Sequence, residues 1–131
     1  MDYHHTSNAI TVRVEVEYVP QDEHPGDDRH VWAYHITMSN GGAFTVQLKT
    51  RHWTITDAMG RVQEVEGPGV VGETPVLKPG DSYTYSSGCP LTTSSGAMSG
   101  YYMFERADGV PLRVIIPAFS LDLPGAKRVL N

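Results

Sequence analysis

The sequence predicts an all-β fold, an antiparallel β-sandwich of seven to nine strands. Three observations support this prediction. Short runs of residues alternate between apolar and polar side chains, which is the period of a half-buried strand. Turn signals separate the runs, and the chain contains 13 glycines and 9 prolines. No window of eleven residues shows the apolar spacing of a helix. With 131 residues, the chain is expected to form one domain, with a core at about 10–123 and flexible termini.

The first half of the chain contains two clear strands. Residues 10–18 alternate without a fault and predict a strand with one apolar face. Residues 20–29 are polar and predict a loop. Residues 31–38 combine alternation with aromatic and β-branched side chains, so we expect a strand that is buried on both faces at points. Asn40-Gly41-Gly42 predicts a tight turn, because these residues tolerate positive φ.

A change of parity marks the next strand. Phe44, Val46 and Leu48 alternate, and Trp53 resumes the pattern at an odd spacing from Leu48. Because side chains on a strand have a period of two, this spacing turns the apolar residues to the opposite face. We therefore expect a β-bulge or a crossing between sheets near residue 50. A turn at 57–60 then leads into a further strand.

The second half of the chain continues the pattern of short strands. Residues 67–80 are rich in glycine and proline and cannot form a helix. A new alternation begins at Tyr83, and we expect it to end at Ser86-Ser87-Gly88. Residues 98–105 and 112–116 predict two strands, joined at Asp108-Gly109 by a hairpin turn.

A second change of parity falls between Ile116 and Phe119, with Pro117 at the break. The tail from Pro124 shows no pattern and is expected to be mobile.

Composition excludes several classes of function. The chain has 10 basic and 15 acidic residues, a net charge of −5, which argues against nucleic-acid or anionic membrane partners. A single cysteine, Cys89, excludes an intrachain disulfide. No apolar run is long enough for a transmembrane helix, and residues 1–8 lack the apolar core of a signal peptide. These features together predict a cytoplasmic protein.

One local motif favours a particular sandwich. Leu77-Lys78-Pro79-Gly80-Asp81-Ser82-Tyr83 resembles the Leu-x-Pro-Gly-x-x-Tyr corner of fibronectin type III domains. In those domains the tyrosine hydroxyl bonds back to the chain as a tyrosine corner. The motif therefore predicts an immunoglobulin- or fibronectin type III-like topology.

Nearly the whole chain, from about Val12 to Leu123, resembles the ApaG family, also called DUF525. The blocks that carry the resemblance are Phe44 to Leu48 with Arg51-His52-Trp53, Gly67-Pro68-Gly69-Val70-Val71-Gly72, Leu77-Lys78-Pro79-Gly80, Tyr85-Ser86-Ser87-Gly88, Gly96-Ala97-Met98-Ser99-Gly100-Tyr101 and Ile116-Pro117-Ala118-Phe119. The resemblance implies a fibronectin III- or immunoglobulin-like sandwich. It also implies an association with cobalt and magnesium homeostasis. In eukaryotes the same domain is a module of some F-box proteins and of a DNA polymerase delta interacting protein.

The glycine block is a candidate anion-binding site. Gly67, Gly69 and Gly72 match the G-x-G-x-x-G pattern that lets a backbone approach a pyrophosphate. In a dinucleotide fold this pattern opens a helix, and the prolines that follow here exclude one. A weaker alternative is an anion nest formed by successive backbone amides. The structural alternative is a loop that needs glycine for its backbone conformation.

The polar loop at 20–29 is a candidate cation site. Asp22, Asp27, Asp28 and His30 supply the carboxylate and imidazole ligands that magnesium or cobalt accept. Their spacing matches no known motif, so we expect at most weak binding, and no other cofactor. The alternative is a solvated acidic loop. His4 and His5 lie on a polar terminus, which we expect to be disordered.

Arg51-His52-Trp53 is the most specific short block. Arginine and tryptophan are favoured anchors of protein interfaces, so Arg51 and His52 are candidates for an interaction surface. Trp53 fits a core position better. For an interaction surface we expect exposed apolar or aromatic side chains near these residues or near the glycine block.

The sequence offers little support for catalysis. Cys89 precedes a proline and fits a small buried residue, and no nucleophile motif is present. We therefore favour a non-catalytic binding module with an unidentified protein partner, or one that pairs with a second copy through exposed strand edges. The second hypothesis is a protein that binds divalent cations or phosphate-containing anions. The third is a hydrolase of pyrophosphate bonds.

Overall fold

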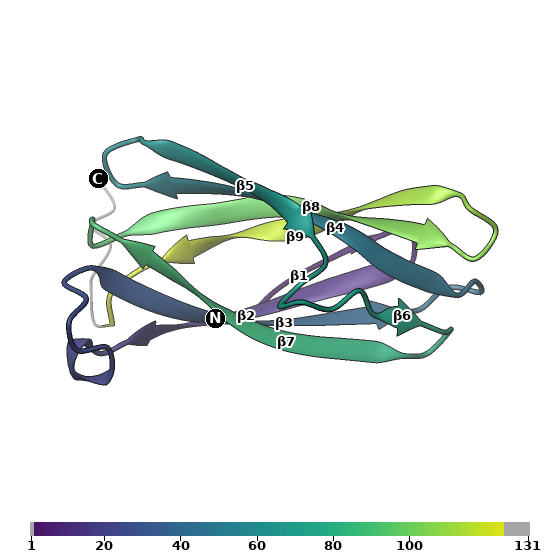
Figure 1. Cartoon of the computed structure of the whole chain (residues 1–131), viewed down its shortest axis with the longest axis horizontal. Coiled ribbons are helices and arrows are strands. Elements are labelled where there is room, and N and C mark those ends of the chain that lie inside the picture. Colours follow the sequence, from purple (N-terminus) through teal and green to yellow (C-terminus); the bar gives the residue numbers. More distant parts are fainter. Residues whose placement is uncertain (1, 125–131) are drawn as a thin grey trace.

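The computed structural model describes residues 2–124 as two antiparallel sheets packed face to face (Figure 1). The strands are β1 (Asp2–Ser7), β2 (Ile10–Val19), β3 (His30–Asn40), β4 (Val46–Asp57), β5 (Val62–Pro68), β6 (Val76–Leu77), β7 (Ser82–Leu91), β8 (Gly96–Arg106) and β9 (Pro111–Leu121). Sheet A has the order β1-β2-β3-β7. Sheet B has the order β5-β4-β8-β9, and β6 pairs with β4. The predicted antiparallel sandwich is confirmed, with nine strands in the described residues.

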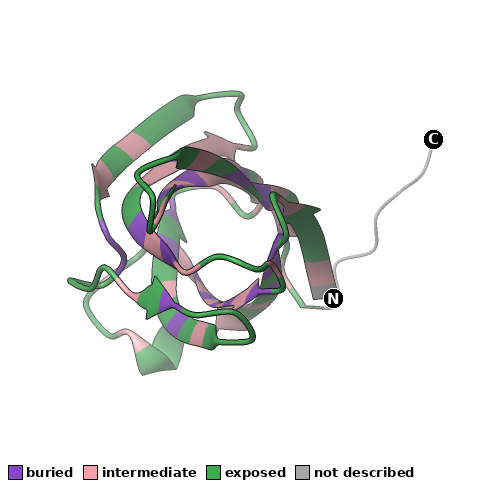
Figure 2. Cartoon of the chain, turned by 90° about the vertical axis from the view of Figure 1, so that its right-hand side faces the viewer, coloured by how far each residue is buried: buried purple, intermediate pink, exposed green. Residues whose placement is uncertain are grey.

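The core lies between the two sheets, where the alternation of each strand places its apolar side chains. Figure 2 shows buried positions recurring along the strands of both sheets. On β2, Ile10, Val12 and Val14 are fully buried, as their alternation predicted. On the facing sheet, Trp53 packs edge-on against Phe119, with ring centroids 6.1 Å apart. Apolar surface removed from water stabilises such a core by roughly 25 cal/mol per Å².

Both changes of parity are β-bulges. Against β8, Leu48 pairs with Phe104 and Thr50 with Met103, so Lys49 is the extra residue. Against β9, Met98 pairs with Phe119 and Gly100 with Ile116, so β9 carries an extra residue around Pro117. Each bulge returns the following apolar side chains to the core face. Near residue 50, where a bulge or a crossing between sheets was expected, the structure has a bulge; the parity change at Pro117 is a second bulge.

One long side of the sandwich is closed by contacts between β1 and β9. The Ser7 hydroxyl accepts a hydrogen bond from the Ile115 amide at 3.1 Å. Just beyond β1, the Asn8 side-chain amide donates to the Arg113 carbonyl at 2.9 Å. On the opposite side, neither β5 nor β7 has a second strand partner among the described residues. This arrangement leaves one open side, flanked by two free strand edges.

The expectation of disorder around His4 and His5 is wrong. Both residues lie in β1, which pairs with β2 along its whole length. Tyr3 anchors this polar strand, because its ring contacts Phe119 and its hydroxyl accepts a hydrogen bond from the Ser120 amide. The predicted mobile tail lies beyond residue 124 and outside the described residues. Within residues 2–124, no helix is long and apolar enough to cross a membrane.

The expected tight turn at Asn40-Gly41-Gly42 is wrong. None of the three has positive φ, and the chain crosses here from sheet A to sheet B. Asn40 is buried, and its side-chain amide donates to the carbonyls of Phe44 and Leu77. The backbone amide of Asn40 donates to the Asp81 carbonyl, and its carbonyl accepts a hydrogen bond from the Gly80 amide. Phe44 lies outside the core and is half exposed, with the Arg106 guanidinium over its ring.

The strand after the Pro-Gly corner also differs from expectation. β7 continues through Ser86-Ser87-Gly88 to Leu91, because these small residues are paired along β3. Among the described residues, the Tyr83 hydroxyl has no hydrogen-bond partner, so the tyrosine corner is absent. Asp81 closes the turn instead, since its carboxylate accepts from the Lys78 amide at 2.9 Å.

Candidate functional site

Arg51 and His52 are neighbours in sequence but point to opposite faces of sheet B. Arg51 pairs with the fully buried Tyr102 across β8 and therefore shares its inward face. His52 pairs with Tyr101 and lies on the outer face. The bulge at Lys49 determines this arrangement, because it sets the parity of every later residue on β4. The two residues therefore belong to two different surfaces.

Arg51 lies at the open side of the sandwich, against the glycine block. Its cross-strand neighbour on β5 is Gly67, and a Cβ atom there would lie 3.1 Å from both Nη atoms of the guanidinium. Nη1 donates to the Pro68 carbonyl at 2.8 Å and to the Gly69 carbonyl at 3.0 Å. The structure thus brings Arg51 together with two of the three candidate glycines.

The backbone amides of the glycine block are largely engaged within the protein. The Gly69 amide donates to the Lys49 carbonyl, and the amides of Val70 and Glu73 bond each other's carbonyls. Val71 and Gly72 form the turn between them, both at positive φ. These bonds leave few amides of the block for an anion nest, while carbonyl oxygens face the Arg51 guanidinium. The geometry favours the structural role of these glycines.

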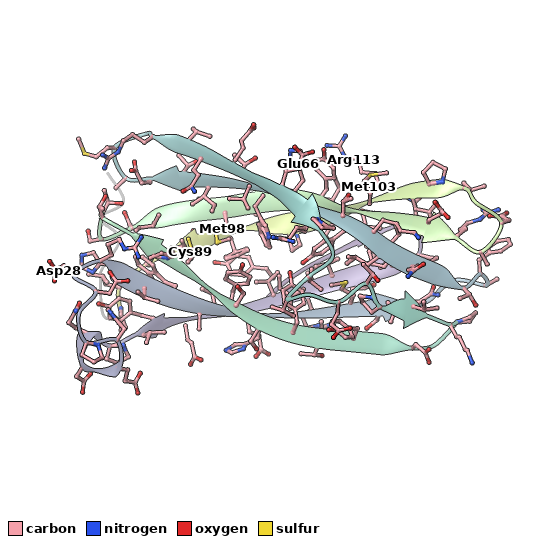
Figure 3. All side chains as sticks on the ribbon, viewed as in Figure 1. Asp28, Glu66, Cys89, Met98, Met103 and Arg113 are labelled. Carbon is pink, nitrogen blue, oxygen red and sulfur yellow. The ribbon has the colours of Figure 1, made fainter. Side chains whose placement is uncertain are left out.

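A cleft of about 320 Å³ lies beside Arg51 and is open to solvent between β5 and β7. Its apolar floor includes Trp53 and Val65, and Figure 3 shows Cys89 and Met98 between the two sheets. Its volume is at the lower end of the range of ligand sites. The cleft is lined by Arg29, Tyr34, Arg51, Trp53, Ile55, Gln63, Val65, Ser87, Gly88, Cys89, Pro90 and Met98.

Two arginines line the cleft, and Arg51 is the one whose charge no neighbouring carboxylate of the described residues neutralises. Burial raises the pKa of the Cys89 thiol to about 11. Burial also raises the pKa of Tyr34, partly opposed by its hydrogen bond to Ser87. Both groups are therefore neutral at pH 7. Arg29 forms an ion pair with Asp27 at 3.0 Å, whereas no carboxylate lies within ion-pair distance of Arg51 among the described residues.

Behind Arg51 lies a buried pair of tyrosines. The hydroxyls of Tyr85 and Tyr102 form a hydrogen bond in the core. Burial raises the pKa of both phenols, so they are neutral and provide no counter-charge for Arg51. The polar end of the cleft therefore carries one net positive charge.

The candidate cation residues are not assembled into a ligand set. The Asp27 carboxylate receives two hydrogen bonds from the Arg29 side chain, which lower its pKa to about 2. His30 lies beside the Tyr18 ring, and Asp22 and Asp28 are exposed. Within residues 2–124, no group of three His, Cys, Asp or Glu side chains could hold a metal ion.

The outer face of sheet B carries a row of stacked polar and aromatic side chains. The His52 ring stacks on Tyr101 with centroids 4.7 Å apart, and its Nδ1 lies 3.2 Å from a Glu66 oxygen. On the other side, the Arg113 guanidinium lies 4.0 Å from the Tyr101 ring centre. Glu66 and Arg113 both project from this face in Figure 3. These groups engage one another on a surface that is separate from that of Arg51.

Sequence reasoning missed most of the cleft. Arg29, Tyr34, Ser87 and Cys89 come from distant segments that only the sandwich topology brings together. The contact of Arg51 with Gly67 could have been found from the hairpin turn at residues 57–60. A hairpin centred on residue 59 places residues equally distant from that centre opposite each other, as 51 and 67 are.

The fold and the cleft define a small β-sandwich domain with one closed and one open side. Residues 20–106 match the family model described as ApaG domain, DUF525. The chain belongs to the ApaG family.

Named relatives match over almost their full length. The ApaG protein of Brucella canis is 54% identical over 129 residues, which cover 98% of this chain and 99% of that one. The ApaG protein of Paramagnetospirillum magneticum is 55% identical over the same shares of the two chains.

Solved structures agree with the fold. An X-ray structure from the Northeast Structural Genomics Consortium has a TM-score of 0.85 at 42% identity, covering 95% of each chain. A crystal structure of an ApaA protein from Bordetella pertussis has a TM-score of 0.83 at 44% identity. It covers 89% of this chain and 95% of that one.

Proposed function

We propose that this chain is a non-catalytic binding module that contacts a partner protein through the open side of its sandwich. The observation that carries the proposal is the pair of unpaired edges, β5 and β7, on either side of the cleft. An edge strand presents unpaired backbone amides and carbonyls, which are a template for pairing with another chain. The apolar side chains Val62 and Val71 are exposed on β5 and on the segment that follows it.

The chemistry of the cleft supports binding rather than catalysis. The Cys89 thiol is held protonated by burial, so it is a poor nucleophile at neutral pH. The polar groups beside it, Tyr34 and Ser87, lie without a histidine or carboxylate among the lining residues. A buried free thiol also fits the reducing cytoplasm, where we expect the module to act.

The family resemblance implies an association with cobalt and magnesium homeostasis. We propose that this association is indirect and depends on the partner protein. Asp27 is the central carboxylate of the candidate cation set, and the Arg29 side chain already neutralises it. A direct cation site that uses Asp27 would have to break this ion pair.

Site-specific photo-crosslinking in cells tests the proposal. A photoreactive amino acid replaces Gln63 on β5 in one variant and the exposed Glu15 on β2 in a matched control. β2 pairs with β1 along one edge and with β3 along the other. Glu15 therefore reports on a strand that has no free edge. We expect a discrete adduct from position 63 and none from position 15. Adducts from position 15 alone, or from neither position, would contradict the proposal. An adduct of twice the chain's mass would identify a second copy as the partner.

A second candidate function is the binding of a small anion, which the unneutralised Arg51 beside the cleft favours. A ligand that binds only the folded state raises the melting temperature by mass action. Thermal unfolding with pyrophosphate or ATP at several concentrations tests this candidate. A saturable rise that Arg51→Lys abolishes would favour it over the protein partner.

A further inference from the structure

We propose that the open side recognises an extended acidic segment of the partner, which adds to β5 as a further strand and pairs one aspartate or glutamate with Arg51. This inference rests on the proposed function and specifies the chemistry of the partner. It joins three independent features of the site: the charge of Arg51, the absence of a side chain at Gly67, and the free edge of β5.

The charge of the site selects a carboxylate. Both hydrogen bonds of the Arg51 side chain are donated by Nη1, to the carbonyls of Pro68 and Gly69. Among the described residues, Nε and Nη2 have no hydrogen-bond partner. A guanidinium presents its donors as a planar fork that matches a carboxylate in two parallel bonds. Arg29, the second cation of the cleft, is neutralised by Asp27. One net positive charge balances a carboxylate, whereas a phosphate at pH 7 would retain unbalanced charge.

Gly67 gives the carboxylate its access. Arg51 on β4 and Gly67 on β5 face each other across the strands, so the residue of an added strand opposite Gly67 would be next in the same row. Any larger side chain at position 67 would cover the guanidinium from this direction. Because glycine has none, the guanidinium reaches the edge of β5, and an acidic side chain on the added strand can meet it.

The next inward-facing pair of β4 and β5 specifies an apolar neighbour for the acid. Val65 is the next inward-facing residue on β5 and pairs with Trp53 on β4. Side chains on one face of a strand recur every second residue, about 6.6–6.8 Å apart. The segment should therefore carry its acid and an apolar residue two positions away, where the floor formed by Trp53 and Val65 receives it.

Two peptide pools of matched composition test the proposal by NMR titration of the full chain. In both pools, Val, Ile, Leu and Phe are varied at the positions two residues before and after a central residue, and threonine fills the remainder. The central residue is glutamate in one pool and glutamine in the other. We expect saturable shifts at Arg51, Val65 and Gln63 with the glutamate pool, and binding at least about tenfold weaker with the glutamine pool.

Protein variants provide a second test. Gly67→Val should abolish binding of the glutamate pool, because its side chain blocks access to the guanidinium. Arg113→Lys changes an arginine on the outer face of sheet B and serves as the matched control, for which unchanged affinity is expected. The comparison of the two pools uses the wild-type chain, so it holds even where a variant fails to fold.

Three results would overturn the inference. They are equal binding of both pools, no saturable shifts with either pool, and acetate or inorganic phosphate binding as tightly as the glutamate pool. The last result would assign the site to small anions. None of these results affects the crosslinking from position 63, which does not depend on charge. A partner captured there that binds equally well to wild type and Arg51→Gln would retain the proposed function and remove the inference.

Discussion

The guanidinium of Arg51 lies over Gly67, its cross-strand neighbour on β5, and reaches past it to the Pro68 and Gly69 carbonyls. An arginine on the inward face of a sandwich must keep its charge near water, since a buried and unpaired charge is costly. Gly67 meets this requirement because it leaves the strand edge uncovered. The pair therefore links the fold of the glycine block to the cleft beside it.

Gly67→Ala should lower the free energy of unfolding by about 1 kcal/mol. Two effects oppose each other. The backbone φ at Gly67 suits alanine, and replacing glycine by alanine in a strand is by itself stabilising by about 0.5–1 kcal/mol. The new Cβ would nevertheless displace the guanidinium from its charged hydrogen bonds, and this loss is the larger effect.

Gly88→Ala is the matched control, because its Cβ would meet only the Trp32 carbonyl at 3.5 Å, an ordinary contact. Urea unfolding of both variants, with the Arg51 Nε–H resonance as a local probe, checks the comparison. Equal stability of the two variants and an unmoved resonance would contradict the role of Gly67.

The turn of the glycine block depends unequally on its glycines. Gly69 has φ +60°, and a Cβ there would lie 2.3 Å from the Glu73 carbonyl oxygen, so the backbone must move. We expect Gly69→Ala to cost about 3 kcal/mol or more. Gly72 also has positive φ but faces open space, and Gly72→Ala should cost about 1 kcal/mol. Urea unfolding measures both values, and the reverse order would refute the account of this turn.

Asn40→Ala should destabilise the chain by about 2–4 kcal/mol. The buried amide donates to two carbonyls and accepts from the Gly42 amide, and each lost bond costs about 1 kcal/mol or more when its partner stays buried. Thr37→Ala removes an exposed hydroxyl pair with Thr84 and should cost less than about 1 kcal/mol. Similar unfolding free energies for the two variants would show that Asn40 does not hold the crossing between the sheets.

Stability should fall in alkaline solution. Burial raises the pKa of Cys89 from 9.0 to about 11, so the folded chain binds this proton more tightly than the unfolded chain. The contribution is complete below pH 9 and is lost as pH rises through about 11. At pH 8, the folded thiol should react with a thiol reagent about a hundredfold more slowly than the unfolded thiol, from the thiolate fractions alone. Equal rates in buffer and in urea would contradict the burial of Cys89.

Much of the fold could be predicted because strand alternation and bulges are local signals. The odd spacing from Leu48 to Trp53 predicted a bulge or a crossing between sheets near residue 50, and the structure has the bulge, at Lys49. β1 was missed because it is polar, and only its pairing with β2 and the packing of Tyr3 hold it. Asn40 was mistaken for a turn residue because asparagine before glycine is a common turn signal, and its long-range hydrogen bonds leave no local pattern. Its partners Leu77 and Asp81 are far along the chain.

The candidate site was predicted only in part. Arg51 and the glycine block were both selected from the sequence, but their contact depends on the register of β4 against β5. His52 was grouped with Arg51, although adjacent residues on a strand face opposite ways. The cleft residues Tyr34 and Cys89 carried no signal, since each resembled an ordinary core residue.

Hydrogen exchange on the complex with the crosslinked partner tests the central claim most directly. We predict that the partner slows exchange of the β5 amides that face away from β4, those of Val62, Glu64 and Glu66, and leaves β1 and β9 unchanged. Protection confined to the closed side or to the outer faces of the sheets, with β5 exchanging as in the free chain, would contradict the assignment of the open side as the binding surface.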